Sequence, residues 1–201
     1  MLFRSAEAIA TAAGISIDPL ADSETVVQGG SLAVTVRTFA PQGAPITVTA
    51  EQVTAPSGWN VESMASADNA PAPNAFAARD VPSHTARYRL AVPADAPLTQ
   101  PYFLQQKRQG DSYAWADDAP KTLPFGPAPL EGHVTMEVGG VSITITRPVQ
   151  YRFGDRVRGE LRREVNVVPA VVDRLGLVVA EQGLVVAMGG DEAGFFHGIG
   201  K

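Results

Sequence analysis

The residues best suited to metal chemistry are three histidines, His84, His133 and His197, and the chain has no cysteine. A hydrolytic zinc site needs about three nitrogen or oxygen ligands around one ion and an open position for water. The three histidines lie far apart in the sequence, so we interpret them as surface or loop residues. We expect no catalytic metal and no cofactor in this chain, and the absence of cysteine excludes thiol catalysis and disulfides.

Serine chemistry and nucleotide binding have no support in the sequence either. No Gly-x-Ser-x-Gly elbow is present, and Gly29-Gly30-Ser31 is typical of a turn. Neither a Gly-x-Gly-x-x-Gly pattern nor a P-loop occurs. We therefore expect that the chain is not an enzyme in its own right.

A dense block of charge occupies residues 155–164. Four arginines alternate there with three carboxylates; the arginines are Arg156, Arg158, Arg162 and Arg163. Charge this nearly balanced favours a solvated strand face with ion pairs, each worth only ~0–1 kcal/mol. The alternative is a docking surface for another domain, in which Arg156, Arg158 and Arg162 would contact carboxylates of the partner.

The aromatic residues allow two interpretations. The set comprises Trp59, Tyr102, Phe103, Tyr113 and Trp115. Trp59 follows a turn and is predicted to lie in a core, and Tyr102 and Phe103 are predicted to pack between modules. Exposed rings could instead stack on sugars, above all Tyr113 and Trp115. Tyr102, Tyr113 and Trp115 are therefore the aromatic candidates for ligand or interdomain contacts.

Composition bounds the function class. The 201 residues are 45% hydrophobic and 18% charged, which is enough to bury a core. The formal net charge of −5 and the lack of a basic region argue against nucleic acid as a partner. No apolar run reaches the roughly 18 residues of a membrane span, and residues 1–7 do not resemble a signal peptide, which a mature exported module would also lack.

Periodicity predicts an all-β protein. Residues 4–13 are alanine-rich and predict a short N-terminal helix that ends at Gly14. Alternating apolar residues predict strands at 32–36, 46–48 and 87–92, and a hairpin formed by 134–138 and 141–145 around Gly139-Gly140. Short strands with frequent turns favour two tandem antiparallel immunoglobulin-like β-sandwich modules. Further strands are expected at 149–153, 163–168, 171–180 and 183–188.

Proline content suggests where the modules divide. Four prolines fall within residues 117–129, a composition typical of a semi-rigid spacer. We therefore predict an N-terminal remnant at 1–17, of which 1–5 would be artificial, and a first module at 18–117. A linker at 118–130 and a second, truncated module at 131–201 complete the division.

The segment Pro148–Pro169 resembles a stretch found late in secreted bacterial deacetylases of the PIG-L (LmbE-like) family. Pro101-Tyr-Phe-Leu104 is similar to the end of an earlier domain of these proteins. Three further motifs are similar to immunoglobulin-like domains appended to such enzymes: Val27–Leu32, Pro56–Trp59 and Tyr88–Pro93. The resemblance covers about residues 18–180 and identifies the non-catalytic C-terminal region of the family.

The resemblance implies that a parent protein removes acetyl groups from N-acetylglucosamine-like sugars with zinc. The family's His-Pro-Asp-Asp motif is absent from this sequence, so no catalytic residue is carried over and the zinc is expected in a catalytic domain elsewhere. This chain would be an accessory or structural module, secreted or located in the periplasm or at the cell surface, and its partner would be that domain.

The alternative is a stand-alone carbohydrate-binding or adhesion module. A planar row of exposed rings on one sheet would favour the binder, and buried rings with an apolar patch on 148–169 would favour the accessory module.

Overall fold

A computed structural model describes residues 2–64, 82–117, 119–120, 126–170, 177–180 and 183–186. The chain divides into two compact units, Met1–Val168 and Pro169–Lys201. The described part is mostly β-strand, with one short α-helix near the N-terminus and a single 3₁₀ turn. The all-β class and the N-terminal helix predicted from the sequence are therefore confirmed.

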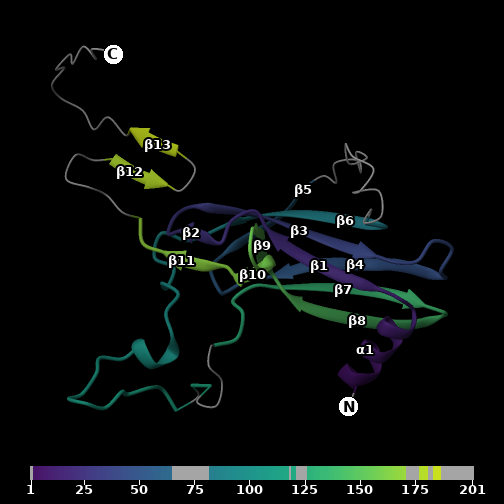
Figure 1. Ribbon diagram of the computed structural model, residues 1–201, viewed down its shortest axis with the longest axis horizontal. Coiled ribbons are helices and arrows are strands. Elements are labelled where there is room, and N and C mark those ends of the chain that lie inside the picture. Colours follow the sequence, from purple (N-terminus) through teal and green to yellow (C-terminus); the bar gives the residue numbers. More distant parts are fainter. Residues whose placement is uncertain are drawn as a thin grey trace, which may run out of the picture. The chain divides into compact units, whose positions relative to one another are not determined.

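The larger sheet of the first unit has six strands in the order β10-β9-β1-β3-β6-β5 (Figure 1). At its centre β3 alternates between buried and partly exposed residues, as the period of two in its sequence predicts. The strands of this sheet are β1 (Ser16–Ala21), β3 (Ser31–Phe39), β5 (Asn60–Met64), β6 (His84–Ala91), β9 (Gln150–Asp155) and β10 (Gly159–Glu164).

A second sheet has three strands in the order β4-β7-β8, namely β4 (Ile46–Thr54), β7 (Glu131–Val138) and β8 (Val141–Pro148). The tight turn between β7 and β8 is formed by Gly139 and Gly140, whose φ angles are +57° and +83°. Side chains other than glycine rarely adopt such angles, so the two glycines permit the two-residue turn. The hairpin predicted from this sequence is confirmed.

The two sheets share one hydrophobic core. Val34, Val36 and Leu90 from the larger sheet and Val134 and Met136 from the smaller sheet are all fully buried. Burial of each such side chain is worth about 1.5–3 kcal/mol, so this interior supplies the main driving force for folding. Trp59 packs against the same core and is partly buried, close to the position expected for it.

The structure divides the chain differently from the two predicted modules. Strand β4 precedes the proline-rich residues 118–130 and pairs along its length with β7, which follows them. Strand β9 also follows the proline-rich residues, and it pairs in parallel with β1, which precedes them. A lone β7–β8 hairpin could not bury its apolar face, and pairing with β4 supplies the third strand that it needs. The proline-rich segment therefore connects strands of one unit and does not separate two domains.

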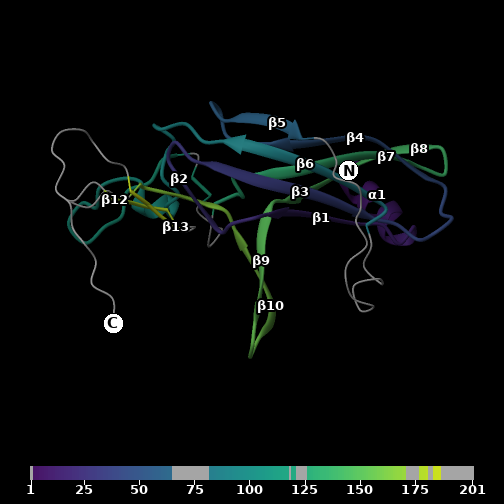
Figure 2. The same cartoon turned by 90° about the horizontal axis from the view of Figure 1, so that it is seen from above.

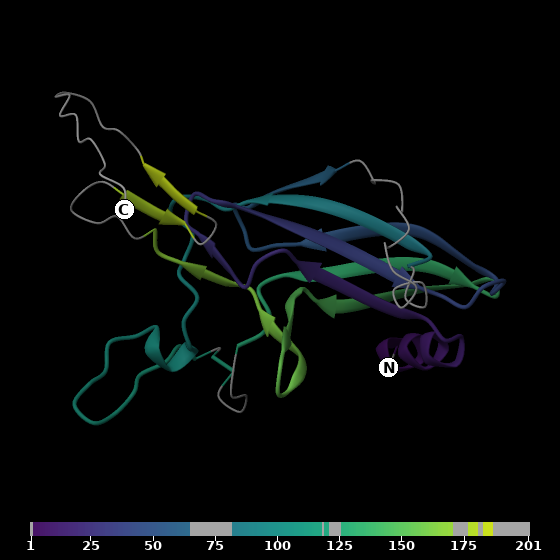
Figure 3. The same ribbon diagram turned by 45° about the horizontal axis from the view of Figure 1, so that its top comes forward.

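The N-terminal helix belongs to this unit as well. Helix α1 (Leu2–Ala12) contacts β8 (Figure 3). Its Ala10 is buried in the shared core. The two terminal nitrogens of the Arg147 guanidinium, Nη1 and Nη2, donate to the carboxylate of Glu7, at 2.6 and 2.7 Å. Residues 1–17, expected to be a remnant, thus contribute α1 and the start of β1.

Strands β9 and β10 form a two-stranded ribbon that projects away from the sheets (Figure 2). Its base is fixed by Asp18 of β1, a buried carboxylate that accepts hydrogen bonds from Arg162 at 2.5 Å and Arg152 at 3.4 Å. Because a buried carboxylate is costly unless it is paired, Asp18 requires these two arginines nearby.

Two short strands, β2 (Thr25–Val27) and β11 (Asn166–Val168), pair in parallel at one end of the first unit. The second unit contains a hairpin of β12 (Leu177–Ala180) and β13 (Gly183–Val186), which fall within the strands predicted at 171–180 and 183–188. The remaining residues of those two predictions, and His197, lie outside the described residues.

Replacing Asp18 tests the anchor of the ribbon. Asp18→Ala removes the shared acceptor of two arginines, so the free energy of unfolding should fall by about 2 kcal/mol, the usual range for hydrogen bonds to charged groups. Amide exchange in 152–162 should rise more than in β3. Asp95→Ala is the control, since Asp95 is exposed and no ion pair involves it in the described part. Equal stability of the two variants in urea denaturation would contradict the anchoring role.

The ion pair between α1 and β8 predicts a dependence on pH. The hydrogen bond from Arg147 lowers the pKa of Glu7 below its ordinary value. Because the pKa is lower in the folded state, the stabilisation is present at neutral pH and is lost as the pH falls through that lowered pKa. NMR titration of the Glu7 carboxyl should give this low value, and Arg147→Ala should return it to the ordinary range. An unchanged titration in Arg147→Ala would refute the coupling.

Candidate functional site

The candidate site is formed by the segment that follows β6 and lies against the end of the first unit. The N–H of Thr99 donates to the carbonyl of Val167 at 3.0 Å, and the N–H of Val167 donates to the hydroxyl of Thr99 at 2.9 Å. Nearby, the side-chain amide of Gln28 donates to the carbonyl of Ala96 at 2.6 Å. These bonds fix residues 96–99 beside β2 and β11, at one end of the first unit.

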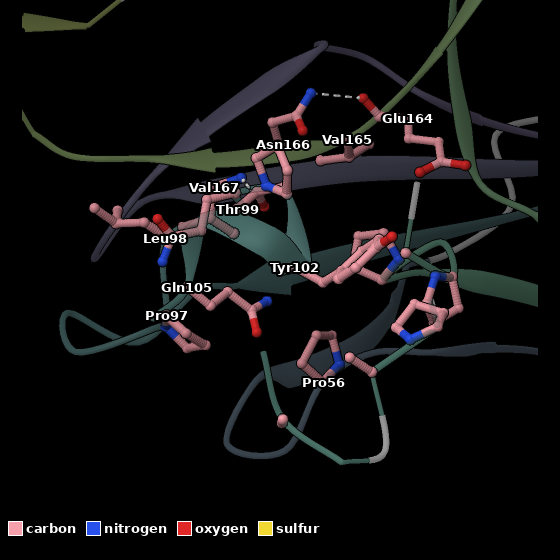
Figure 4. A pocket seen from close by; sticks show the side chains of 18 of the residues that line it. Pro56, Pro97, Leu98, Thr99, Tyr102, Gln105, Glu164, Val165, Asn166 and Val167 are labelled. Carbon is pink, nitrogen blue, oxygen red and sulfur yellow. Dashed lines mark hydrogen bonds between the residues drawn. The ribbon is translucent and has the colours of Figure 1, made fainter. Parts of the chain in front are cut away.

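Between this segment and β11 lies an open cleft of about 650 Å³ (Figure 4). Its walls come from the turn before β5, from residues 97–105, from the proline-rich connection and from residues 164–167. Six prolines line it, together with the rings of Trp59 and Tyr102 and the side chains of Leu98, Val165 and Val167. The volume is within the range of about 300–1,000 Å³ that is usual for ligand sites.

Polar side chains complete the lining of the cleft. Gln100, Gln105 and Asn166 supply amides, and Glu164 supplies a carboxylate. The side-chain nitrogen of Asn166 donates to the backbone carbonyl of Glu164 at 3.1 Å, which orients this amide (Figure 4). The carboxylate of Glu164 forms no ion pair with any residue that the structure describes, so it can accept hydrogen bonds from a ligand.

Beside the cleft four rings form an aromatic cluster, which we define as Tyr102, Phe103, Tyr113 and Trp115. Tyr102 meets Phe103 and Trp115 edge-on, with ring centroids 5.5 and 6.2 Å apart, and Phe103 meets Tyr113 edge-on at 5.9 Å. Tyr113 and Trp115 are 47% and 42% exposed. The rings therefore hold one another in place while presenting an apolar surface to solvent.

The structure brings together three of the predicted site residues and separates the other three from them. Tyr102, Tyr113 and Trp115 belong to the aromatic cluster, and Tyr102 also lines the cleft. None of the three arginines lines the cleft. Arg162 is bound to Asp18 and, at 2.9 Å, to Glu160, and these hydrogen bonds raise the pKa of its guanidinium.

The other two arginines, Arg156 and Arg158, lie in the turn at the tip of the β9–β10 ribbon. The carboxylate of Asp155 accepts hydrogen bonds from the N–H groups of Arg158 and Val157, both at 2.8 Å, and these bonds lower its pKa. Val157 at the tip is 94% exposed. The block is thus an ordered ribbon with exposed arginines at its tip, and its base contacts β1.

Two of the three histidines are placed by the structure. The Nδ1 atom of His84 lies 2.8 Å from the carboxylate of Glu51, whose side chain is only 6% exposed. The charge of Glu51 also acts on Tyr88. Burial of the Tyr88 side chain, with that charge as the second cause, raises the pKa of the Tyr88 hydroxyl. The Nδ1 atom of His133 lies 2.9 Å from the hydroxyl of Thr146. Among the described residues there is no cluster of three or more His, Cys, Asp or Glu side chains suited to a metal ion.

Sequence reasoning missed most of the cleft. Gln100, Gln105, Glu164 and Asn166 are ordinary polar residues in separate segments, and no local pattern sets them apart. They meet because Thr99 pairs with Val167 across 68 positions of sequence. Only knowledge of that pairing would have indicated the site.

No protein family, curated protein or solved structure was found to match the chain. None of the described helices is both long enough and apolar enough to cross a membrane.

The aromatic cluster leads to a prediction about stability. Full burial of Phe103 between two modules would make Phe103→Ala cost about 3–5 kcal/mol. In the structure no residue of the 3₁₀ turn Tyr102–Leu104 is buried, so the cost should be only about 1 kcal/mol. Leu90→Ala, in the fully buried core, is the comparison and should cost about 2–5 kcal/mol. Similar losses for the two variants in denaturant melts would show that the ring is buried after all.

Proposed function

We propose that this chain is a non-catalytic accessory module of a secreted PIG-L-type sugar deacetylase and that it contacts the catalytic domain through the aromatic cluster. The observation that carries the proposal is the exposure of large apolar side chains within residues 98–115. These residues form no named strand, so the rings are not a planar row on one sheet, and they are not buried as an accessory module was expected to have them. Leu98, Leu104, Tyr113 and Trp115 are each more than 40% exposed. Apolar surface concentrated in this way usually marks an interaction site.

The residues of the cluster suit a protein partner. Tyrosine and tryptophan are enriched among the residues that contribute most to interface affinity, because each buries a large area and can also donate a hydrogen bond. Their edge-to-face contacts hold the rings before a partner arrives, which reduces the entropy lost on binding. We further propose that the sandwich is of the immunoglobulin-like kind that the resemblance implies.

In this proposal the zinc belongs to the catalytic domain. The described residues of this chain do not fit a catalytic zinc site, because His84 and His133 each have only one carboxylate neighbour. The module would instead hold the catalytic domain or position its substrate. Its location would be that of the parent, outside the cytoplasm.

The first test is genetic. The reading frame upstream of this sequence should encode a domain with a His-Pro-Asp-Asp motif, and a complete upstream frame without one would reject the family assignment.

The second test is binding of that catalytic domain to the present chain by calorimetry. Trp115→Ala should weaken the complex by about tenfold, the effect expected for a residue central to an interface. Val141→Ala is the matched control, since Val141 is also an exposed apolar residue but lies at the β7–β8 turn, at the other end of the first unit from the cluster (Figure 1). Equal losses in both variants, or no complex at all, would overturn the proposed docking.

A further inference from the structure

We propose that the cleft beside the aromatic cluster is a binding site for a neutral oligosaccharide. The inference goes beyond the docking role and does not depend on it, because it concerns the present chain alone. It rests on three features of the lining: ring faces, side-chain amides and the carboxylate of Glu164, which has no ion-pair partner among the residues that the structure describes.

The apolar part of the lining suits the C–H faces of sugar rings. Trp59 and Tyr102 contribute aromatic surfaces, and the prolines around them add rigid apolar walls. Ligand sites typically combine a mostly apolar lining with a few polar groups that fix orientation. Tyr102 is held by edge-on contacts with Phe103 and Trp115, so its ring is ordered before any ligand arrives.

The polar part of the lining suits hydroxyl groups. Gln105 and Asn166 carry amides that both donate and accept hydrogen bonds, and each sugar hydroxyl also does both. Glu164 can only accept when ionised, so it requires a ligand with donors. Hydroxyl groups meet that requirement without bringing charge into the cleft.

Two other ligand classes fit the same lining less well. An anionic ligand would be repelled by Glu164, and none of the described residues that line the cleft is an arginine or lysine that could offset that repulsion. A proline-rich peptide would match the aromatic and proline surfaces, but proline has no N–H donor. Its binding would leave the carboxylate of Glu164 desolvated without a partner, which is costly.

The test uses the full 201-residue chain and four probes: cellohexaose, the N-acetylated hexamer hexa-N-acetylchitohexaose, the anionic hexamer of galacturonic acid, and decaproline. Calorimetry and NMR titration should show saturable binding of at least one neutral hexasaccharide, with shifts at Tyr102, Gln105 and Asn166. The galacturonic acid hexamer and decaproline should not bind. Absence of saturable binding for both neutral sugars, or binding of decaproline at these residues, would overturn the proposal.

Variants locate the site and test its selectivity. Tyr102→Ala and Gln105→Ala should each weaken the sugar by about tenfold, whereas Gln52→Ala, an exposed glutamine on β4, should change nothing. Glu164→Gln should allow the galacturonic acid hexamer to bind, which a merely structural role of Glu164 would not produce. Neither Tyr102 nor Gln105 is buried, so melting temperatures should confirm that these variants fold. Unchanged sugar affinity in both, or continued exclusion of the anionic hexamer by Glu164→Gln, would place any bound sugar elsewhere.

Discussion

The pairing of β4 with β7 is the constraint on which the first unit depends. It joins a strand from the N-terminal part of the chain to a hairpin from beyond the proline-rich segment, and so it closes the smaller sheet over the larger one. Between β4 and β7 the chain crosses to the larger sheet, where it forms β5 and β6, and it must then return to the smaller sheet. The described residues of the connection after β6, namely 97–117, 119–120 and 126–129, form none of the named strands, and they carry the aromatic cluster and part of the lining of the cleft.

The local elements could be predicted because their signals are local. Gly139-Gly140 between alternating valines and isoleucines specifies a hairpin whatever surrounds it, and the alanine-rich start specifies a helix. The partner of each strand could not be predicted in the same way. Residues of β4 alternate between the two faces of the sheet whether the strand pairs with a neighbour from the N-terminal part of the chain or with β7. The alternation alone therefore does not identify the partner strand. The prolines of 118–130 were equally ambiguous, since a rigid extended segment serves as a domain linker or as a connection within one domain.

The arginine block illustrates the same limit for charge. Its charges nearly balance, but within the block the structure shows one ion pair, between Arg162 and Glu160, and Arg163 instead pairs with Glu24 of the segment before β2. The decisive partner, however, is Asp18, which lies more than 130 residues earlier and is buried. Because desolvation makes such a carboxylate dependent on its arginines, the contact between β1 and the base of the ribbon is more specific than an exposed ion pair. The tip, with Arg156, Val157 and Arg158, matches the solvated face expected from the sequence, and Glu160 and Arg163 are exposed as well.

Tyr102 connects the two functional proposals, because it lines the cleft and also contacts the ring of Trp115. Docking at the exposed side of the cluster and binding in the cleft would therefore share one ordered ring. If a partner bound to Trp115 favours one position of Tyr102, sugar affinity changes by some factor, and thermodynamic linkage requires that sugar change the affinity of the partner by the same factor. If the ring does not move, the two equilibria are independent. Since sugar binding requires only this chain, each can be measured before their coupling is considered.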